Sequence, residues 1–263
     1  MPVLLSLDLE SGCDGMKLSG NTILITGGSS GIGFALAERF LELGNTVIAC
    51  GRSEGKLKDA KERLPALNTF ACDVSKEADR KRLVNFIKES FPGINILVNN
   101  AGIQLKVDLK KGTEELAANH EIEINMIACI YMSAEFIPLL SGKEESAIMN
   151  VSSGLGIVPR ALYPIYSATK AGIRSFTKSL RVQLKDTGIK VFDIIPPLVH
   201  DTELHYGKQL ERTENSVSAA ELAEQVVEGM KADRYEIAAG PAKKWLDLST
   251  NGQLEQLFQN MNR

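Results

Sequence analysis

The sequence contains few residues that bind metals or form disulfide frameworks. Its 263 residues include four cysteines and three histidines, and no two cysteines are spaced as C-x-x-C. No cysteine–histidine cluster has zinc spacing, so no metal is expected. We interpret the cysteines as buried free thiols of a cytoplasmic protein, since the cytosol is reducing; they are Cys13, Cys50, Cys72 and Cys129.

Excess charge of one sign and long apolar runs are also lacking. The formal net charge is −3, and the lysines and arginines are scattered rather than grouped in a basic stripe. A nucleic-acid partner is therefore not expected. No apolar run approaches the roughly 20 residues that span a bilayer, so no membrane span is expected. The 44% apolar and 24% charged residues are typical of a globular protein.

The first fifteen residues, MPVLLSLDLESGCDG, lack the features of a targeting signal. They start with a short apolar stretch, but they have no basic region and soon reach Asp8 and Glu10. Met16 begins MKLSGNTILITGG, which is a more natural start. We expect residues 1–15 to be a disordered leader or extension, and residues 16–263 to form a single domain.

From Asn21 onward, apolar runs alternate with amphipathic segments. Runs such as TILITG, TVIACG, INILVNNAG and IKVFDIIPP are typical of buried strands, and helical patterns cover about 76–90, 113–140 and 164–186. The alternation predicts an α/β fold, a doubly wound Rossmann-type domain with about seven parallel strands and helices on both faces. The segment at about 198–216 has few apolar residues and is expected to be a mobile substrate flap.

A glycine-rich turn joins the first predicted strand to the first predicted helix. It reads TGGSSGIG, with glycines at 27, 31 and 33. Glycine is needed where φ is positive or where the backbone approaches a ligand, and a helix N-terminus attracts phosphate. This context predicts a dinucleotide site. A tight turn without a ligand is the alternative.

The end of the second predicted strand favours NADP over NAD. It reads VIACGR and presents Arg52 but no acidic residue at the strand end. In dinucleotide folds an acidic residue there holds the ribose 2′-hydroxyl, whereas an arginine accommodates a 2′-phosphate. Ser29, Ser30 and Ser53 add hydroxyls nearby. Against this, Glu54 lies close, and a solvated loop charge is the alternative interpretation of Arg52.

Four motifs occur in order and at characteristic separations. They are the glycine loop, NNAG at 99–102, NVSS at 150–153 and YSATK at 166–170. Together they resemble the short-chain dehydrogenase/reductase family over about residues 18–240. Within the family the chain looks most like the oxidoreductase of bacterial D-alanylation (Dlt) operons. This subgroup resemblance rests on IYSATKAG and on "PP" rather than "PG" after the sixth strand.

The resemblance implies a catalytic set of Asn125, Ser153, Tyr166 and Lys170. Tyr166 would be the general acid/base, and Lys170 would lower its pKa and bind the nicotinamide ribose. Ser153 would bind the substrate oxygen, with Ser152 as its rival. Asn125 would kink the long helix and hold a water in a proton relay; its alternative role is a buried structural amide. The implied cofactor contacts come from Thr26, Gly27, Ser29, Ser30, Gly31, Ile32, Gly33, Arg52, Asp73, Val74, Asn99, Ala101, Gly102, Tyr166, Lys170, Pro196, Val199 and Thr202.

The pairing of Tyr166 with Lys170 also follows from general chemistry. A free tyrosine has a pKa of about 10, which is too high for an efficient proton shuttle at neutral pH. A cation four residues further on lies one helical turn away and favours the phenolate. Pro164 suits the first turn of a helix, which places Tyr163 at its start. Tyr166 also follows Ser153 by thirteen residues, the usual family spacing, whereas Tyr163 follows it by ten.

One segment departs from the family pattern P-G-x-V-x-T. The chain has PPLVHDT at 196–202, so Pro197 replaces the glycine and Asp201 stands where the threonine is expected. Either the loop contains a one-residue bulge, or Thr202 does not hold the nicotinamide carboxamide. Val199 would still bind the carboxamide through its backbone.

The sequence therefore predicts an NADP(H)-dependent oxidoreductase that acts on a small carbonyl compound or secondary alcohol. One alternative is a non-catalytic NADP-binding regulatory or assembly protein on the same fold. Another is an epimerase or dehydratase of the extended branch, although little chain remains for its larger C-terminal domain. Family members usually associate through the helices predicted at about 113–140 and 164–186, so a homodimer or homotetramer is expected.

Overall fold

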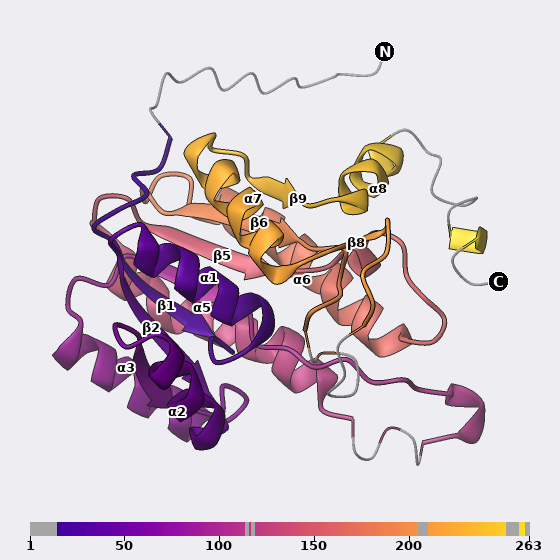
Figure 1. Ribbon diagram of the computed structural model, residues 1–263, viewed down its shortest axis with the longest axis horizontal. Helices are drawn as coiled ribbons and strands as arrows, with labels where there is room; N and C mark the ends of the chain where they lie inside the picture. Colours follow the sequence, from indigo (N-terminus) through magenta and orange to yellow (C-terminus); the bar gives the residue numbers. More distant parts are fainter. Residues whose placement is uncertain are drawn as a thin grey trace.

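Seven parallel strands form the central sheet of the computed structural model, which describes residues 15–113, 116, 119–202, 204, 210–250 and 258–260 (Figure 1). The strand order is β3-β2-β1-β4-β5-β6-β9. The strands are β1 (Thr22–Thr26), β2 (Thr46–Gly51), β3 (Asn68–Ala71), β4 (Ile96–Asn99), β5 (Ala147–Val151), β6 (Lys190–Ile195) and β9 (Glu236–Ala238). The chain leaves β1 toward one edge and returns through β4 toward the other, as in a doubly wound fold. The predicted fold is confirmed.

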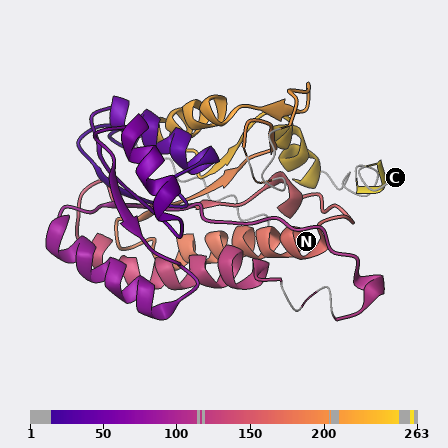
Figure 2. The ribbon, with the colours of Figure 1, turned by 60° about the horizontal axis from the view of Figure 1, so that its bottom comes forward.

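Helices cover both faces of this sheet. They are α1 (Gly31–Glu42), α2 (Glu54–Arg63), α3 (Glu77–Ser90), α5 (Ala128–Leu140), α6 (Pro164–Gln183), α7 (Ala219–Lys231) and α8 (Pro241–Thr250). Figure 2 shows α1 and α7 on one side, and α5 and α6 on the other. Short 3-10 turns, η1 (Leu109–Lys111) and η3 (Gly154–Gly156), lie in the loops after β4 and β5.

Successive strand side chains alternate between two cores. On β1, Ile23 and Ile25 pack in the core that contains α1 and α7 residues, whereas Leu24 packs in the core that contains α3, α5 and α6 residues. This follows from the two-residue period of a strand. Because both faces are covered, the central strands β1, β4 and β5 are mostly apolar and buried, as expected for a parallel sheet.

The long helix expected over about 113–140 begins later than expected. Asn119 and His120 are not helical, and the helix begins as a π-helical segment, η2 (Ile122–Ile127), that continues into α5. Asn119 Oδ1 accepts a hydrogen bond from Glu121 N at 2.9 Å. Such local bonds compete with helix formation before them. Residues 114, 115, 117 and 118 lie outside the described part of the chain.

The segment Ile122–Leu140 is long and apolar enough to cross a membrane by length and composition alone. Its side chains Met132, Phe136 and Leu140 are buried in the core beneath the sheet. A core helix passes the same test, and packing under the sheet accounts for these three apolar side chains.

Two other expectations concern segments that the structure describes only in part. Of the proposed leader at residues 1–15, only residue 15 is described. The expected flap at about 198–216 has its two ends joined. The strand β7 (Leu198–Val199) at its start pairs in parallel with β8 (Ser216–Val217) at its end. Cys50, Cys72 and Cys129 are buried and free, as predicted, and Cys13 lies outside the description.

Candidate active site

A cavity of about 540 Å³ lies at the carboxyl ends of β1, β2, β4 and β5. Segments that follow these strands line it, together with residues of α6 such as Tyr166 and Lys170. In open α/β sheets, ligands bind outside the carboxyl ends of the strands, where the strand order reverses. The cavity occupies this position beside β1 and β4.

The glycine loop has the conformation that its sequence predicts. Gly31 opens α1 with φ +53°, a left-handed conformation that favours glycine. A Cβ added at Gly33 would collide with the carbonyl oxygen of Gly27. Ser30 precedes α1 without a side-chain cap, so its hydroxyl does not satisfy the first N–H groups of the helix. The loop therefore brings unpaired backbone donors to the cavity.

Two basic side chains are among the residues that line the cavity. Arg52 and Lys56 line it, together with the predicted Asp73 and Val74. Glu54, which weakened the sequence argument for NADP, is exposed and is not among the lining residues that the structure describes. Lys56 was not predicted. The sequence feature that could have identified Lys56 is its position about one turn after Arg52, at the start of a predicted helix.

Thr26 acts behind the cavity and does not line it. Its Oγ1 accepts hydrogen bonds from Asn100 N at 2.9 Å and Ala101 N at 3.0 Å. It thereby ties the glycine loop to the loop after β4. Asn99 is also buried behind the wall, where its Nδ2 donates to Asn150 Oδ1 at 2.9 Å. Asn100, not Asn99, lines the cavity.

Tyr166 and Lys170 lie one turn apart on α6, and both line the cavity. Tyr166 hydrogen-bonds the Ser153 side chain. The rival hydroxyl of Ser152 donates to Ile194 O at 3.2 Å, toward the sheet. Ser153 is therefore the serine that faces the phenol. Tyr163 precedes the helix and is not among the described lining residues, in agreement with the preference for Tyr166.

Burial sets the pKa values of this pair. It raises the pKa of Tyr166 to about 12; the bond with Ser153 lowers this pKa, and the charge of Glu121 raises it. Burial lowers the pKa of Lys170 to about 8. The predicted lowering of the tyrosine pKa is therefore not seen. The reason is geometric, because Lys170 Nζ donates to Val151 O at 2.7 Å and lies 5.6 Å from the centroid of the Tyr166 ring.

Asn125 lies in the π-helical segment, where a kink was expected, and π-helical turns often mark functional sites. Its amide pairs with the backbone of Ile103, accepting from N at 2.8 Å and donating to O at 2.9 Å. Asn125 thus holds the loop after β4 against the helix. A cavity of about 10 Å³ beside it is lined by Asn99, Asn125 and Lys170, among others.

In the segment that departs from the family pattern, Asp201 and Thr202 have different positions. Asp201 turns away, and its Oδ1 accepts from Ala219 N at 2.9 Å at the start of α7. Thr202 is buried and lines the cavity, with its methyl group 3.3 Å from a Cβ built at Gly31. Its hydroxyl donates to Val199 O at 3.0 Å. Thr202 therefore does reach the cavity, whereas Val199 is paired in β7.

Most of the predicted site residues meet at the one cavity. The residues that line it are Gly27, Ser29, Ser30, Gly31, Ile32, Arg52, Asp73, Val74, Ala101, Gly102, Tyr166, Lys170, Pro196 and Thr202. The others support its wall from behind or beside it, namely Thr26, Gly33, Asn99, Asn125, Ser153 and Val199. Sequence reasoning missed the residues just beyond the NNAG motif, Ile103, Gln104 and Leu105. No motif extends to them.

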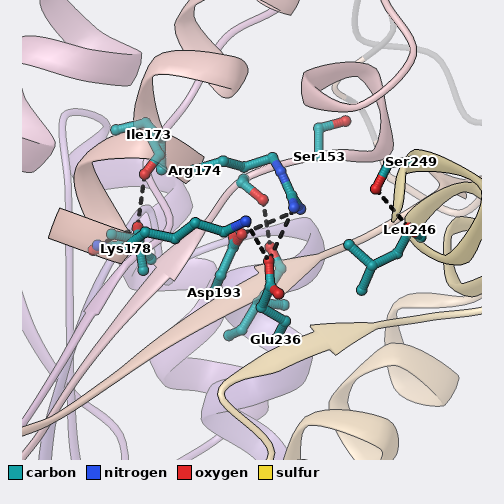
Figure 3. A network of polar contacts seen from close by, with 12 residues as sticks. Ser153, Ile173, Arg174, Lys178, Asp193, Glu236, Leu246 and Ser249 are labelled. Carbon is teal, nitrogen blue, oxygen red and sulfur yellow. Dashed lines mark hydrogen bonds and ion pairs between the residues drawn. The ribbon is translucent and has the colours of Figure 1, made fainter. Parts of the chain in front are cut away.

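An ionic network anchors the helix that carries Tyr166 and Lys170. Figure 3 shows Arg174 of α6 reaching Asp193 of β6 and Glu236 of β9. The ion pairs measure 3.2 Å from Arg174 Nη1 to Asp193 Oδ2 and 3.0 Å from Nη2 to Glu236 Oε1. Asp193 is fully buried, and burial raises its pKa while Arg174 lowers it. The network fixes α6 one turn beyond Lys170.

Comparisons with known proteins identify the family of this chain. The model of the short chain dehydrogenase family matches residues 21–213. The chain is 44% identical to the uncharacterized oxidoreductase DltE of Bacillus subtilis (strain 168), over 94% of this chain and 98% of that protein. It is 34% identical to the NADP-dependent 3-hydroxy acid dehydrogenase YdfG of Salmonella typhi, over 69% and 73% of the two chains.

A solved structure shows the same fold. It is a short chain dehydrogenase from Burkholderia cenocepacia J2315 in complex with NADP, with a TM-score of 0.80 and 23% identity over 94% of this chain and 99% of that one. The family resemblance predicted from the four motifs, including the likeness to DltE, is thereby confirmed. The chain is an oxidoreductase that belongs to the short-chain dehydrogenase/reductase family.

Proposed function

We propose that the protein is an NADP(H)-dependent oxidoreductase that transfers a hydride between nicotinamide and a small carbonyl compound or its secondary alcohol. One observation carries the proposal. A single cavity has Tyr166 and Lys170 in its wall together with the glycine loop and Arg52. This shared lining supports proton chemistry and dinucleotide binding in one space.

The cavity residues fit a dinucleotide with a 2′-phosphate. The uncapped N-terminus of α1 offers backbone N–H groups to a pyrophosphate. Arg52 and Lys56 supply positive charge for a phosphate on the ribose. Thr202 lines the same cavity beside Gly31, so it can contact the bound cofactor. NAD lacks the phosphate that these two basic side chains would bind.

When bound, the nicotinamide supplies or accepts the hydride, and the protein handles the proton. With a pKa of about 12, Tyr166 is protonated at neutral pH and can donate to the oxygen that becomes negative in carbonyl reduction. Ser153 bonds the same phenol and can polarise that oxygen. Lys170, with a pKa of about 8, carries its charge at neutral pH and can hold the ribose hydroxyls.

The small cavity supports a proton path behind this pair. Its volume of about 10 Å³ is close to the smallest space that holds one water. Lys170 lines it, and so does Asn99, whose buried Oδ1 has no hydrogen-bond partner in the part of the chain that the structure describes. A water here would give Asn99 Oδ1 a donor and connect Lys170 to the interior amide network.

The substitution Tyr166→Phe tests the proposal. The variant should bind NADPH about as well as the parent but lose carbonyl reduction by about 100-fold or more, because it removes the general acid. Tyr163→Phe is the matched control and should retain turnover. NADPH and NADH are compared in parallel, by fluorescence titration for binding and by absorbance for turnover of a carbonyl panel.

Three results would contradict the proposal. Unchanged turnover in Tyr166→Phe would remove Tyr166 from the chemistry. Tight NADPH binding by the parent, with no oxidation across the panel, would favour the non-catalytic alternative. Preference for NADH would overturn the assignment of Arg52.

A further inference from the structure

Gln104 stands out in the wall of the large cavity. It is only 6% exposed, and its Oε1 is buried without a hydrogen-bond partner. No other described residue lining this cavity has such an unpartnered buried side-chain atom. Leaving a buried polar group unpaired costs about 1–3 kcal/mol. A ligand that supplies the missing partner would recover this free energy.

The backbone on both sides of Gln104 is held in place. Asn125 pairs with both backbone groups of Ile103. Glu121 Oε1 accepts from Leu105 N at 3.0 Å, and its Oε2 accepts from Asn119 Nδ2 at 2.9 Å. These contacts come from the start of the long helix and grip the residues before and after Gln104. The amide therefore belongs to a pre-organised wall, which is the condition for selective recognition.

The atom left unpaired indicates what kind of group it would bind. Oε1 of an amide is an acceptor, so its partner must carry an O–H or N–H donor. The nearby Glu121 carboxylate is fully buried, and its charge reaches the site, since it raises the pKa of Tyr166. A negative charge there disfavours an anionic group on the ligand. A neutral hydroxyl or an amine fits better than a carboxylate.

We propose that Gln104 is a specificity-determining residue that accepts a hydrogen bond from a hydroxyl or amine group of a substrate bound in the cavity that Tyr166 also lines. The preferred substrates are thus hydroxy- or amino-ketones or aldehydes rather than keto acids. This inference rests on the proposed function, because it names the substrate class of that site. It differs from the acid substrate that the name of the relative YdfG implies for that protein.

Matched ketone pairs test this inference. Acetoin is compared with 3-methyl-2-butanone, and 4-hydroxy-2-butanone with 2-pentanone, so that a methyl group replaces each hydroxyl. Acetoacetate is the anionic member. In the parent enzyme we expect kcat/KM for at least one hydroxyketone to exceed that of its isostere by about 10-fold, the value of one satisfied buried acceptor. Acetoacetate should be the poorest substrate.

Substitutions then assign the preference to Gln104. Gln104→Met has a similar length but no acceptor oxygen, and should bring the ratio within each pair to about one. Gln104→Glu retains an acceptor and should keep the preference for hydroxyketones while rejecting acetoacetate further. Gln183→Met is the matched control, because Gln183 is exposed at the end of α6. It should leave every ratio unchanged.

Binding separates failure of this inference from failure of the proposed function. Saturation-transfer NMR in the presence of NADP⁺ measures the same ketones without turnover. If no ketone is reduced, the proposed function fails, but stronger binding of the hydroxyketones that is lost in Gln104→Met still supports the inference. Equal binding and turnover within both pairs in the parent, or ratios that persist in Gln104→Met, would overturn it.

Discussion

Burial controls the two titrating groups of the candidate active site more than their mutual interaction does. Lys170 lies one turn from Tyr166, yet its ammonium points to the Val151 carbonyl. Loss of water raises the pKa of the phenol to about 12 and lowers that of the ammonium to about 8. Over the physiological range the tyrosine therefore stays protonated, and the lysine is the group of the pair that titrates near neutral pH.

We expect carbonyl reduction to fall as the pH rises through about 8. Lys170 loses its charge there, whereas Tyr166 keeps its proton until about pH 12 and cannot cause the fall. The measurement is kcat/KM against pH for a ketone that the parent reduces. Lys170→Arg keeps a charge throughout and should lack the fall, at a lower absolute rate. A parent profile that is flat to pH 10 would contradict the role of Lys170.

At the scale of single elements, two attachments position the catalytic groups. The π-helical start of the long helix holds the loop that follows β4 through Asn125 and Glu121. Helix α6 is held at its other side by Arg174, which reaches the buried Asp193 and the edge strand β9 (Figure 3). The first attachment holds a loop that lines the cavity, and the second joins α6 to the middle of β6 and the start of β9.

Removing Arg174 should destabilise the fold strongly. Arg174→Met leaves the buried Asp193 without its ion-pair partner, and such a change costs about 3–5 kcal/mol in the free energy of unfolding. The double variant Arg174→Met/Asp193→Leu removes both charges and should recover most of that loss. Urea unfolding followed by circular dichroism measures all three proteins.

Lys178→Met is the control for this network. Lys178 is 56% exposed on its side chain and pairs with Glu236 at 3.5 Å, so its loss should cost less than about 1 kcal/mol. If Arg174→Met cost no more than this control, or the double variant were less stable than Arg174→Met, the ion pair would not anchor α6.

At the scale of the whole molecule, the face covered by α5 and α6 keeps apolar side chains in solvent. Tyr131 is 51% exposed and Val182 is 67% exposed, and Ile122 and Ile127 add to the outer side of the first helix. The inner sides of both helices pack in the core beneath the sheet. Apolar residues exposed on helices that are already packed are typical of a protein–protein interface.

We therefore expect a homodimer or homotetramer formed through these helices. Tyr131→Glu should shift the protein toward monomer in sedimentation velocity at micromolar concentration, because it buries a charge in the interface. The fold should survive, since Arg80 lies 4.7 Å from the Tyr131 ring and can pair with the new carboxylate. A parent that sediments only as a monomer would contradict this expectation.

Local sequence motifs predicted much of the candidate site, but they could not predict properties that depend on contacts between distant residues. The glycine loop and the YSATK motif are short segments whose roles follow from local backbone geometry, and both lie at the cavity. The tyrosine pKa was predicted wrongly because burial and the Val151 contact join residues far apart in the chain. Gln104 carried no motif. Its significance depends on contacts from Asn125 and Glu121, roughly one helix-length away in sequence.

The sequence by itself determined the parallel α/β fold and its family, because strand periodicity, glycine positions and motif order are properties of neighbouring residues. The tertiary structure alone decided which side chains reach the cavity. It turned Asp201 toward α7 and Thr202 toward the glycine loop, and it placed Gln104 in the wall with an unused acceptor. Those outcomes depend on packing between distant segments, which fixes orientation and water exclusion and so decides the chemistry of each group.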